Sequence, residues 1–187
     1  MELEFHENLI ARIDELMARQ DRVLVAIDGC CGAGKTTLAA ALAAHYRCNV
    51  IHMDDFFLRP EQRTPQRYTE PGGNVDYERF FEEVLLPLKA GKTFSYRPFD
   101  CKTFTLAPGV AVMPGRLTII EGSYSLHPYF GEPYDLKIFL SVDEELQRRR
   151  ILARPAHLHG RFFGEWIPME NRYFREFAIR EKCGIVR

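Results

Sequence analysis

The sequence predicts an α/β protein whose parallel sheet is covered by helices on both faces, and three observations support this fold class. Apolar runs rich in β-branched residues predict buried strands at 23–27, 49–53, 117–120 and 135–140. Segments with helical spacing alternate with these runs, as they do along the chain of a parallel sheet. The first run passes through a glycine-containing loop into an Ala/Leu-rich stretch at 38–44, which predicts a helix.

Four segments outside these runs have recognisable patterns. Residues 3–20 place apolar side chains near helical spacing and predict an amphipathic helix that packs on the sheet. Residues 56–74 are rich in Pro, Gly and Arg and predict a loop. A helix is expected at 76–88, capped by its first residue. Short alternating runs at 93–112 predict a small hairpin or an irregular flap.

The loop after the first strand carries a phosphate-binding motif. Gly29, Gly34, Lys35 and Thr36 match G-x-x-x-x-G-K-[ST] between a strand and a helix. Glycines let backbone N–H groups converge on phosphate oxygens, and the helix N-terminus adds its positive dipole end. The lysine places a charge near the β- and γ-phosphates, and the threonine hydroxyl can bind Mg²⁺. A plain glycine turn is the alternative. The residues expected to bind ATP are Gly29, Cys30, Cys31, Gly32, Ala33, Gly34, Lys35, Thr36 and Thr37.

Acidic residues follow three of the predicted strands, namely Asp28, Asp54-Asp55 and Glu121. In open parallel sheets, ligands bind beyond the carboxyl ends of the strands. A carboxylate after the strand at 49–53 could orient an acceptor hydroxyl and take its proton during phosphoryl transfer. Glu121 could organise Mg²⁺ together with Thr36. Each acid alone could equally be a strand-end cap or a solvated charge, but their occurrence behind a phosphate-binding loop favours function.

A predicted helix from Asp143 carries a cluster of arginines, and a Gly- and His-containing stretch at 155–164 interrupts it before a last helix at 166–179. Because the cluster spans more than one turn, only one or two arginines can face the transferring phosphate. A solvated basic helix face is the alternative. We expect the stretch up to Arg161 to close as a lid that excludes water. The cluster consists of Arg148, Arg149, Arg150 and Arg154.

Composition limits the remaining possibilities. The 187 residues carry a net charge of −1, so no basic field favours nucleic acid as a partner. No apolar run approaches the length of a membrane span and the N-terminus lacks a signal-peptide pattern, so a cytoplasmic protein without a membrane partner is expected.

The five cysteines fit neither a zinc site nor a disulfide framework. Cys30 and Cys31 are expected to be reduced and structural, with an oxidisable thiol as the alternative.

The order of the motifs resembles the uridine kinase-like P-loop kinases, a group with uridine-cytidine kinases, nicotinamide riboside kinases, pantothenate kinases and phosphoribulokinase. The resemblance runs from Val23 to Phe174. It implies a P-loop NTPase three-layer sandwich in a single domain, 1–187, with an acceptor-binding insert at about 56–113 and an Arg-rich lid at about 148–164. It rests on the P-loop, His-Met-Asp54-Asp55-Phe-Phe, Asn74-Val-Asp76, Arg97-Pro-Phe99-Asp100, Glu121-Gly122 and the arginine cluster.

The resemblance also implies individual roles. Asp54 matches the catalytic base, Asp76 is similar to the acid that binds ribose hydroxyls, and Glu121 matches the acid near the metal. The segment from Arg97 resembles a wall of the base pocket, although Phe99 stands where Tyr is usual. The residues expected in catalysis are Asp54, Lys35, Arg150 and Arg154. Those expected to bind the acceptor are Asp54, Asp76, Tyr77, Arg97, Phe99 and Arg161, and those expected to bind Mg²⁺ are Thr36 and Glu121.

Together these features predict an ATP- and Mg²⁺-dependent kinase that phosphorylates a primary hydroxyl of a small molecule, first of all the 5′-hydroxyl of a nucleoside. Nicotinamide riboside, pantothenate or a sugar acid are alternative acceptors. An ATP-binding regulatory switch is the alternative outside the enzymes. The chain has no Asn-Lys-x-Asp signature, which argues against a GTPase.

Overall fold

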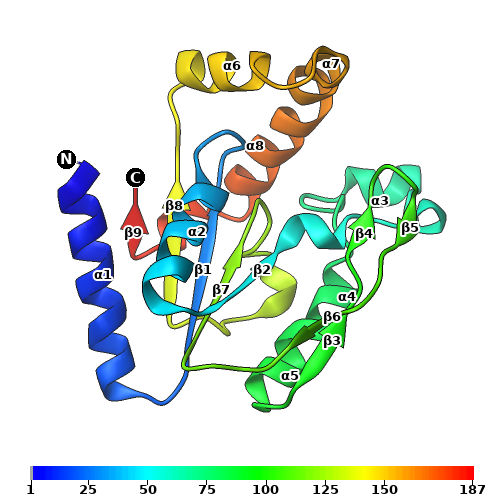
Figure 1. The fold of residues 1–187 in the computed structure, drawn as a ribbon. Helices are drawn as coiled ribbons and strands as arrows, with labels where there is room; N and C mark the ends of the chain where they lie inside the picture. The colour runs from blue at the N-terminus through cyan, green and yellow to red at the C-terminus, as the bar shows by residue number, and fades with distance from the viewer. Residues whose placement is uncertain (1) are drawn as a thin grey trace.

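Five strands form one parallel sheet in the computed structural model, which describes residues 2–187 (Figure 1). The strand order is β2-β7-β1-β8-β9, so the strand that leads into the P-loop lies in the middle. The four predicted strands are confirmed, and the short β9 near the C-terminus was not predicted. The strands are β1 (Val23–Gly29), β2 (Asn49–His52), β7 (Leu117–Glu121), β8 (Leu136–Leu140) and β9 (Ile185–Val186).

Two helices cover one face of this sheet. They are α1 (Glu2–Arg19) and α2 (Lys35–Tyr46), in blue and cyan in Figure 1. Leu9 and Ile13 of α1 are fully buried in the same cluster as Leu42 of α2. Alternate residues of β1, β7 and β8 complete this cluster, as the two-residue period of a strand requires. The predicted amphipathic helix is therefore confirmed.

The other face packs against two helical segments. One runs through α4 (Tyr77–Phe80), a π-helical turn at Phe81–Leu85 and α5 (Leu86–Lys89). The other runs through α7 (His159–Arg161), a second π-helical turn at Phe162–Trp166 and α8 (Ile167–Glu176). Their buried side chains meet residues of the opposite strand faces in a second cluster. Helices on both sides of a parallel sheet confirm the predicted P-loop NTPase three-layer sandwich.

Residues 53–113 leave the sheet and return to it (right-hand side of Figure 1). The expected hairpin region consists of two antiparallel pairs, β3 (Phe94–Tyr96) with β6 (Val110–Val112), and β4 (Phe99–Asp100) with β5 (Thr105–Leu106). The expected loop at 56–74 is only partly irregular. A 3₁₀ turn at Met53–Phe56 precedes it, and it contains a second 3₁₀ turn at Pro60–Gln62 and the helix α3 (Pro65–Thr69). Thr64 caps α3 by accepting a hydrogen bond from the Arg67 N–H at 3.1 Å, a signal that the sequence prediction missed.

The arginine-bearing helix α6 (Glu144–Leu152) begins as predicted, with Asp143 capping the Leu146 N–H at 2.8 Å. The predicted interruption at 155–164 is too long, because the chain is helical again from His159 after a 3₁₀ turn at Ala156–Leu158. Phe162 is 6% exposed and packs with Cys31 and Ile151, which holds this helix against the P-loop despite its glycines.

The last elements are 3₁₀ turns at Pro128–Phe130 and Arg180–Lys182. Within residues 2–187, no helix combines the length and the apolar character that a membrane span requires.

Candidate active site

The P-loop joins β1 to α2 at the carboxyl edge of the sheet. Gly29 has φ of +135°, and a Cβ there would lie 2.0 Å from the carbonyl oxygen of Leu140. The next residue, Cys30, donates its N–H to that same oxygen at 3.0 Å. Only a glycine therefore lets the loop run this close to β8. The loop from Cys31 to Thr37 lines one large cavity.

Lys35 lies within this loop and is 8% exposed. Its Nζ donates to the carbonyl oxygens of Gly29 at 2.8 Å and Cys30 at 3.0 Å, and to Ser123 Oγ at 3.2 Å. The three ammonium donors thus already have acceptors within the chain. Lys35 lines the cavity together with the other residues of the loop from Cys31 to Thr37.

Oxygen ligands suitable for Mg²⁺ lie beside the lysine. The Thr36 hydroxyl donates to Glu121 Oε1 at 3.2 Å, and His52 Nδ1 lies 2.5 Å from the same carboxylate oxygen. The described residues contain no group of three or more His, Cys, Asp or Glu side chains that could hold a metal by themselves. One hydroxyl and one carboxylate fit the usual protein contribution to Mg²⁺, whose remaining ligands are phosphate oxygens and water.

Asp54 follows β2 in a 3₁₀ turn, and its side chain lines the same cavity as Lys35 and Glu121. Surrounding protein atoms raise the pKa of its carboxyl group, and the charges of Glu121 and Glu170 add to this, while Lys35 and His52 act in the opposite direction. The structure therefore brings into one cavity the residues that the sequence predicts to bind a phosphate, a metal and a hydroxyl group, namely Lys35, Glu121 and Asp54.

The raised pKa of Asp54 leads to a pH prediction. Only the carboxylate form can accept a proton, so kcat/KM should fall about tenfold per pH unit below the pKa of Asp54. Because that pKa lies above the ordinary value of 3.8, the fall should begin at a higher pH than for a free aspartate. A pH–rate profile measures this, and ATP affinity over the same range separates it from protonation of the phosphates. A rate that stays flat down to pH 4 would contradict the assignment.

Asp28, the acid at the end of β1, has a different environment. It is fully buried and accepts hydrogen bonds from the N–H groups of Gly29 at 2.7 Å and Tyr124 at 3.1 Å. The Tyr173 hydroxyl donates to it at 2.9 Å and the Leu126 N–H at 3.0 Å. Burial raises the pKa of Asp28 to about 6. This acid joins three chain segments behind the P-loop and does not line the cavity.

The arginine cluster divides as the helical spacing requires. Arg150 donates from Nη1 to the carbonyl oxygen of Gly32 at 2.7 Å, so it lies directly on the P-loop. Arg154 stacks over Phe162 with its guanidinium carbon 4.8 Å from the ring centre, and Arg161 stacks over Trp166 at 4.7 Å. These three arginines line the cavity, whereas Arg148 and Arg149 do not.

Four residues expected to bind the acceptor lie outside this cavity. Tyr77 stacks on His127 with ring centres 4.3 Å apart. Arg97 donates to the carbonyl oxygens of Leu106 and Ala107 within the hairpin region, and Phe99 is 4% exposed. Asp76 is 2% exposed and caps α4 through the Arg79 N–H at 3.2 Å. The cavity wall on this side consists instead of Phe57, Leu58, Arg63, Tyr68, Asn74, Cys101, Lys102 and Phe104.

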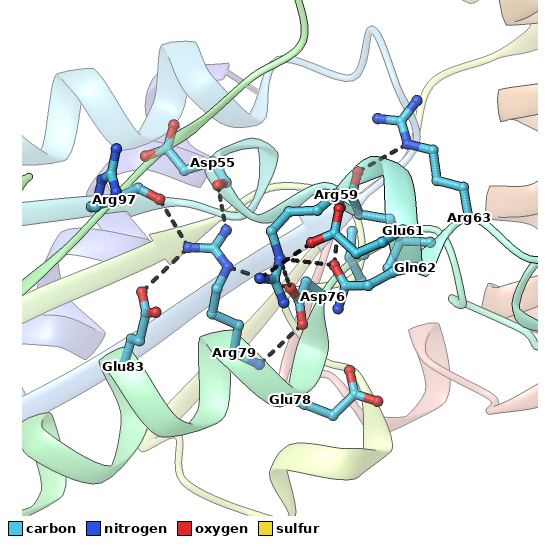
Figure 2. A network of polar contacts seen from close by, with 12 residues as sticks. Asp55, Arg59, Glu61, Gln62, Arg63, Asp76, Glu78, Arg79, Glu83 and Arg97 are labelled. Atoms are coloured by element: carbon cyan, nitrogen blue, oxygen red, sulfur yellow. Dashed lines mark hydrogen bonds and ion pairs between the residues drawn. The ribbon is translucent and has the colours of Figure 1, made fainter. Parts of the chain in front are cut away.

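Arg79 is an important residue of this region that the sequence prediction missed. Its buried guanidinium donates to the carbonyl oxygens of Arg97 at 2.8 Å and Asp55 at 2.9 Å (Figure 2). Its Nε lies 3.4 Å from Asp76 Oδ2, while Arg59 Nε lies 3.6 Å from the same oxygen. Arg79 therefore ties the turn that carries Asp54 to α4 and to the hairpin region. Its position three residues after Asp76 was the available signal.

Glu170 and Ser123 were also missed. Glu170 is 6% exposed in α8 and accepts a hydrogen bond from the Cys31 N–H in the P-loop at 2.8 Å. Ser123 donates to Glu170 at 2.7 Å. Glu170 stands in a helix far along the chain, so no local pattern could have placed it here. Ser123 directly follows the predicted Glu121-Gly122 motif.

The cysteines of the P-loop carry no sign of a reactive thiol. Burial raises the pKa of Cys31 to about 12, with the charge of Glu170 as the second cause, and burial also raises the pKa of Cys30. Both thiols are therefore protonated at neutral pH, and all five cysteines are free.

Comparison with known proteins identifies relatives of this fold and site. The chain matches no established family profile. A candidate uridine kinase of Schizosaccharomyces pombe is 31% identical over 178 aligned residues, which cover 82% of this chain and 73% of that protein. Nicotinamide riboside kinase 2 of Mus musculus is 30% identical over 165 residues, which cover 83% and 81%. A candidate fructose transport system kinase of Silicibacter sp. TM1040 has a TM-score of 0.74 at 25% identity, with 98% of both chains covered.

A parallel sheet with a P-loop at the end of its middle strand defines a P-loop NTPase fold. The chain belongs to the uridine kinase-like family of P-loop kinases, and the resemblance seen in its sequence is confirmed. It is a small-molecule kinase that transfers a phosphoryl group to a hydroxyl group.

Proposed function

We propose that the protein transfers the γ-phosphoryl group of ATP to the 5′-hydroxyl of a nucleoside with the help of Mg²⁺. The observation that carries this proposal is the convergence of Lys35, Glu121 and Asp54 on one cavity. Lys35 and the P-loop amides would bind the phosphates, and Thr36 and Glu121 would hold Mg²⁺, which supplies charge neutralisation between the phosphates. Asp54 would orient the acceptor hydroxyl and accept its proton.

The lid arginines would stabilise the charge of the transferring group. Arg150 and Arg154 line the cavity and lie on and just after α6. A guanidinium contributes most when water is excluded from the site. We propose that residues 148–164 close over the phosphates, with Arg161 near the acceptor, and that residues 56–113 bind the acceptor.

Asp76 is proposed to bind the ribose diol. Its Oδ2 is buried and has no hydrogen-bond donor within bonding geometry, since Arg59 and Arg79 lie 3.4 to 3.6 Å away. Such an oxygen can still accept a hydrogen bond from a hydroxyl group. Asp76 lies close in sequence to Asn74, which lines the cavity. Binding of a ribose by Asp76 requires Arg59, which is half-exposed, to move aside.

An Asp76→Asn variant is expected to raise KM for a nucleoside about tenfold and to leave the affinity for ATP unchanged. Asparagine keeps an oxygen that can cap α4, so the comparison separates binding from folding. Glu83→Gln, at the rim of the same arginine network, is the control, since the one ion pair of Glu83 within the described residues is with Arg79 at 3.3 Å. Steady-state kinetics over a panel of nucleosides measures the effect. An unchanged KM would remove Asp76 from acceptor binding.

A sugar acid is a second candidate acceptor, favoured by the charge of the cavity wall. Arg63 donates from Nε to the Leu58 carbonyl oxygen at 3.0 Å, and its guanidinium stacks on Phe99 and Phe104 at 5.4 and 5.0 Å. No acid of the described chain pairs with it within 4.0 Å, so its terminal nitrogens remain available to a carboxylate. Phosphorylation of sugar acids but of no nucleoside in the same panel would select this candidate.

A further inference from the structure

Glu170 is a buried carboxylate at the centre of the site whose function is unexplained. One oxygen accepts from the Cys31 N–H at 2.8 Å and the other from Ser123 Oγ at 2.7 Å. Both its partners lie next to groups of the transfer site, since Cys31 belongs to the P-loop and Ser123 lies two residues after Glu121. Burying a carboxylate costs free energy that hydrogen bonds such as these offset only in part, so stability alone gives little reason for its placement here.

The contacts continue from Ser123 to the lysine. Lys35 Nζ lies 3.2 Å from Ser123 Oγ, and that oxygen lies 3.1 Å from the Gly29 carbonyl oxygen, which Lys35 also contacts. Glu170, Ser123 and Lys35 therefore form a chain of hydrogen bonds across three separate elements. Its far end, α8, continues without a break from the lid residue Arg161 through the π-helical turn.

We propose that Glu170 is a positioning residue for phosphoryl transfer, which holds Lys35 through Ser123 and the P-loop through Cys31, and so links the lid helix to the transferring phosphate. The carboxylate does not bind the nucleotide itself, because two negative groups would repel each other there. Its function is to keep the ammonium and the loop in the geometry that transfer requires, and errors of about 1 Å can cost about 100-fold in rate.

The charge of Glu170 also acts on Asp54. Burial raises the pKa of that carboxyl group, the charges of Glu121 and Glu170 raise it further, and Lys35 and His52 lower it. Removing the charge of Glu170 should therefore lower the pKa of Asp54. A substitution that only loosened the fold would not move the pH–rate profile in this direction.

Three variants and one control test the proposal, which rests on the proposed kinase function but not on a particular acceptor. Glu170→Gln keeps the shape of the side chain and can still accept from Cys31, but it removes the charge and turns an N–H toward Ser123. Ser123→Ala breaks the link to Lys35, and the double variant combines both changes. Glu176→Gln, an exposed glutamate at the end of the same helix, is the control.

Two measurements are made on each variant, with the acceptor that the wild-type chain phosphorylates best. Steady-state kinetics gives kcat and the pH–rate profile. Titration with ATP followed by the fluorescence of Trp166, the one tryptophan of the sequence, gives nucleotide affinity without turnover. Trp166 lines the same cavity one helical turn before Glu170.

We expect Glu170→Gln to lower kcat about tenfold or more, to bind ATP at least as tightly as the wild type, and to shift the acid limb of its profile to lower pH. The double variant should lose no more than the more impaired single variant, because both act through one connection. Wild-type kcat in Glu170→Gln, an unshifted acid limb or additive losses in the double variant would each overturn the proposal. If the wild type phosphorylates no nucleoside, the proposed acceptor fails instead, and the same variants are then compared with a sugar acid.

Discussion

An Asp54→Asn variant is expected to bind ATP normally and to turn over about 100-fold or more slowly than the wild-type chain. Asparagine has nearly the same shape but cannot take the proton of the acceptor hydroxyl at neutral pH. Its side chain lines the cavity, and within residues 2–187 no hydrogen bond or ion pair joins it to the P-loop, so the phosphate-binding geometry should be unaffected. Rapid-quench measurement of the transfer step, together with an ATP titration, tests both parts of the expectation.

Asp55→Asn is the matched control for this experiment. Asp55 lies in the same 3₁₀ turn, but its Oδ2 accepts a hydrogen bond from the Tyr96 hydroxyl at 3.0 Å and the residue does not line the cavity. We expect its transfer rate to stay within about threefold of the wild type. A larger loss in Asp55→Asn than in Asp54→Asn would exchange the roles of the two neighbouring acids, and equal rates in all three chains would remove both from the chemistry.

A Gly29→Ala variant is expected to lose more than about 2 kcal/mol of unfolding free energy together with its ATP binding. The added Cβ would lie 2.0 Å from the Leu140 carbonyl oxygen and 2.7 Å from the Leu140 nitrogen, both backbone atoms that cannot turn away. A φ of +135° is strained for alanine in addition. The loop would have to move away from β8, and the hydrogen bond from the Cys30 N–H to the Leu140 carbonyl oxygen would break.

Gly160→Ala is the control for the glycine substitution. Gly160 lies in α7, and a Cβ there meets no atom within 4 Å. Alanine favours a helix more than glycine does, so this variant should be neutral or slightly more stable. Thermal unfolding with and without ATP compares the two. Equal melting temperatures for both alanine variants would show that the close approach at Gly29 is easily relieved.

The sheet was predictable from the sequence because each of its inner strands is buried on both faces and carries a continuous apolar run. The π-helical turns and the short helix α3 could not be predicted in this way. A π-helical turn differs from an α-helix by one extra residue per turn, and α3 depends on a single N-cap. The end of the proposed lid, residues 148–164, shows the same limit. Two glycines near Phe162 predict a break in the helix. The packing of the Phe162 ring on Ile151 and Cys31 stabilises a helix there instead.

The site was predictable where its residues lie in a local motif and not where they are joined by tertiary contacts. The placement of Lys35, Thr36, Glu121 and Asp54 on one cavity follows from the end points of adjacent parallel strands. Tyr77 could not be placed in this way. It faces the buried ring of His127 instead of the cavity, and no spacing in the sequence reveals a partner fifty residues away.

The hydrogen bonds of Lys35 have a thermodynamic consequence. The Lys35 ammonium already donates hydrogen bonds to two carbonyl oxygens and a hydroxyl. A triphosphate that binds here must therefore replace these hydrogen bonds. The carbonyl and hydroxyl groups of the chain thus compete with the nucleotide phosphates for the Lys35 ammonium. Nucleotide binding should accordingly release less heat than the charges alone suggest, and discrimination should come from how well each nucleotide replaces the bonds that the lysine gives up.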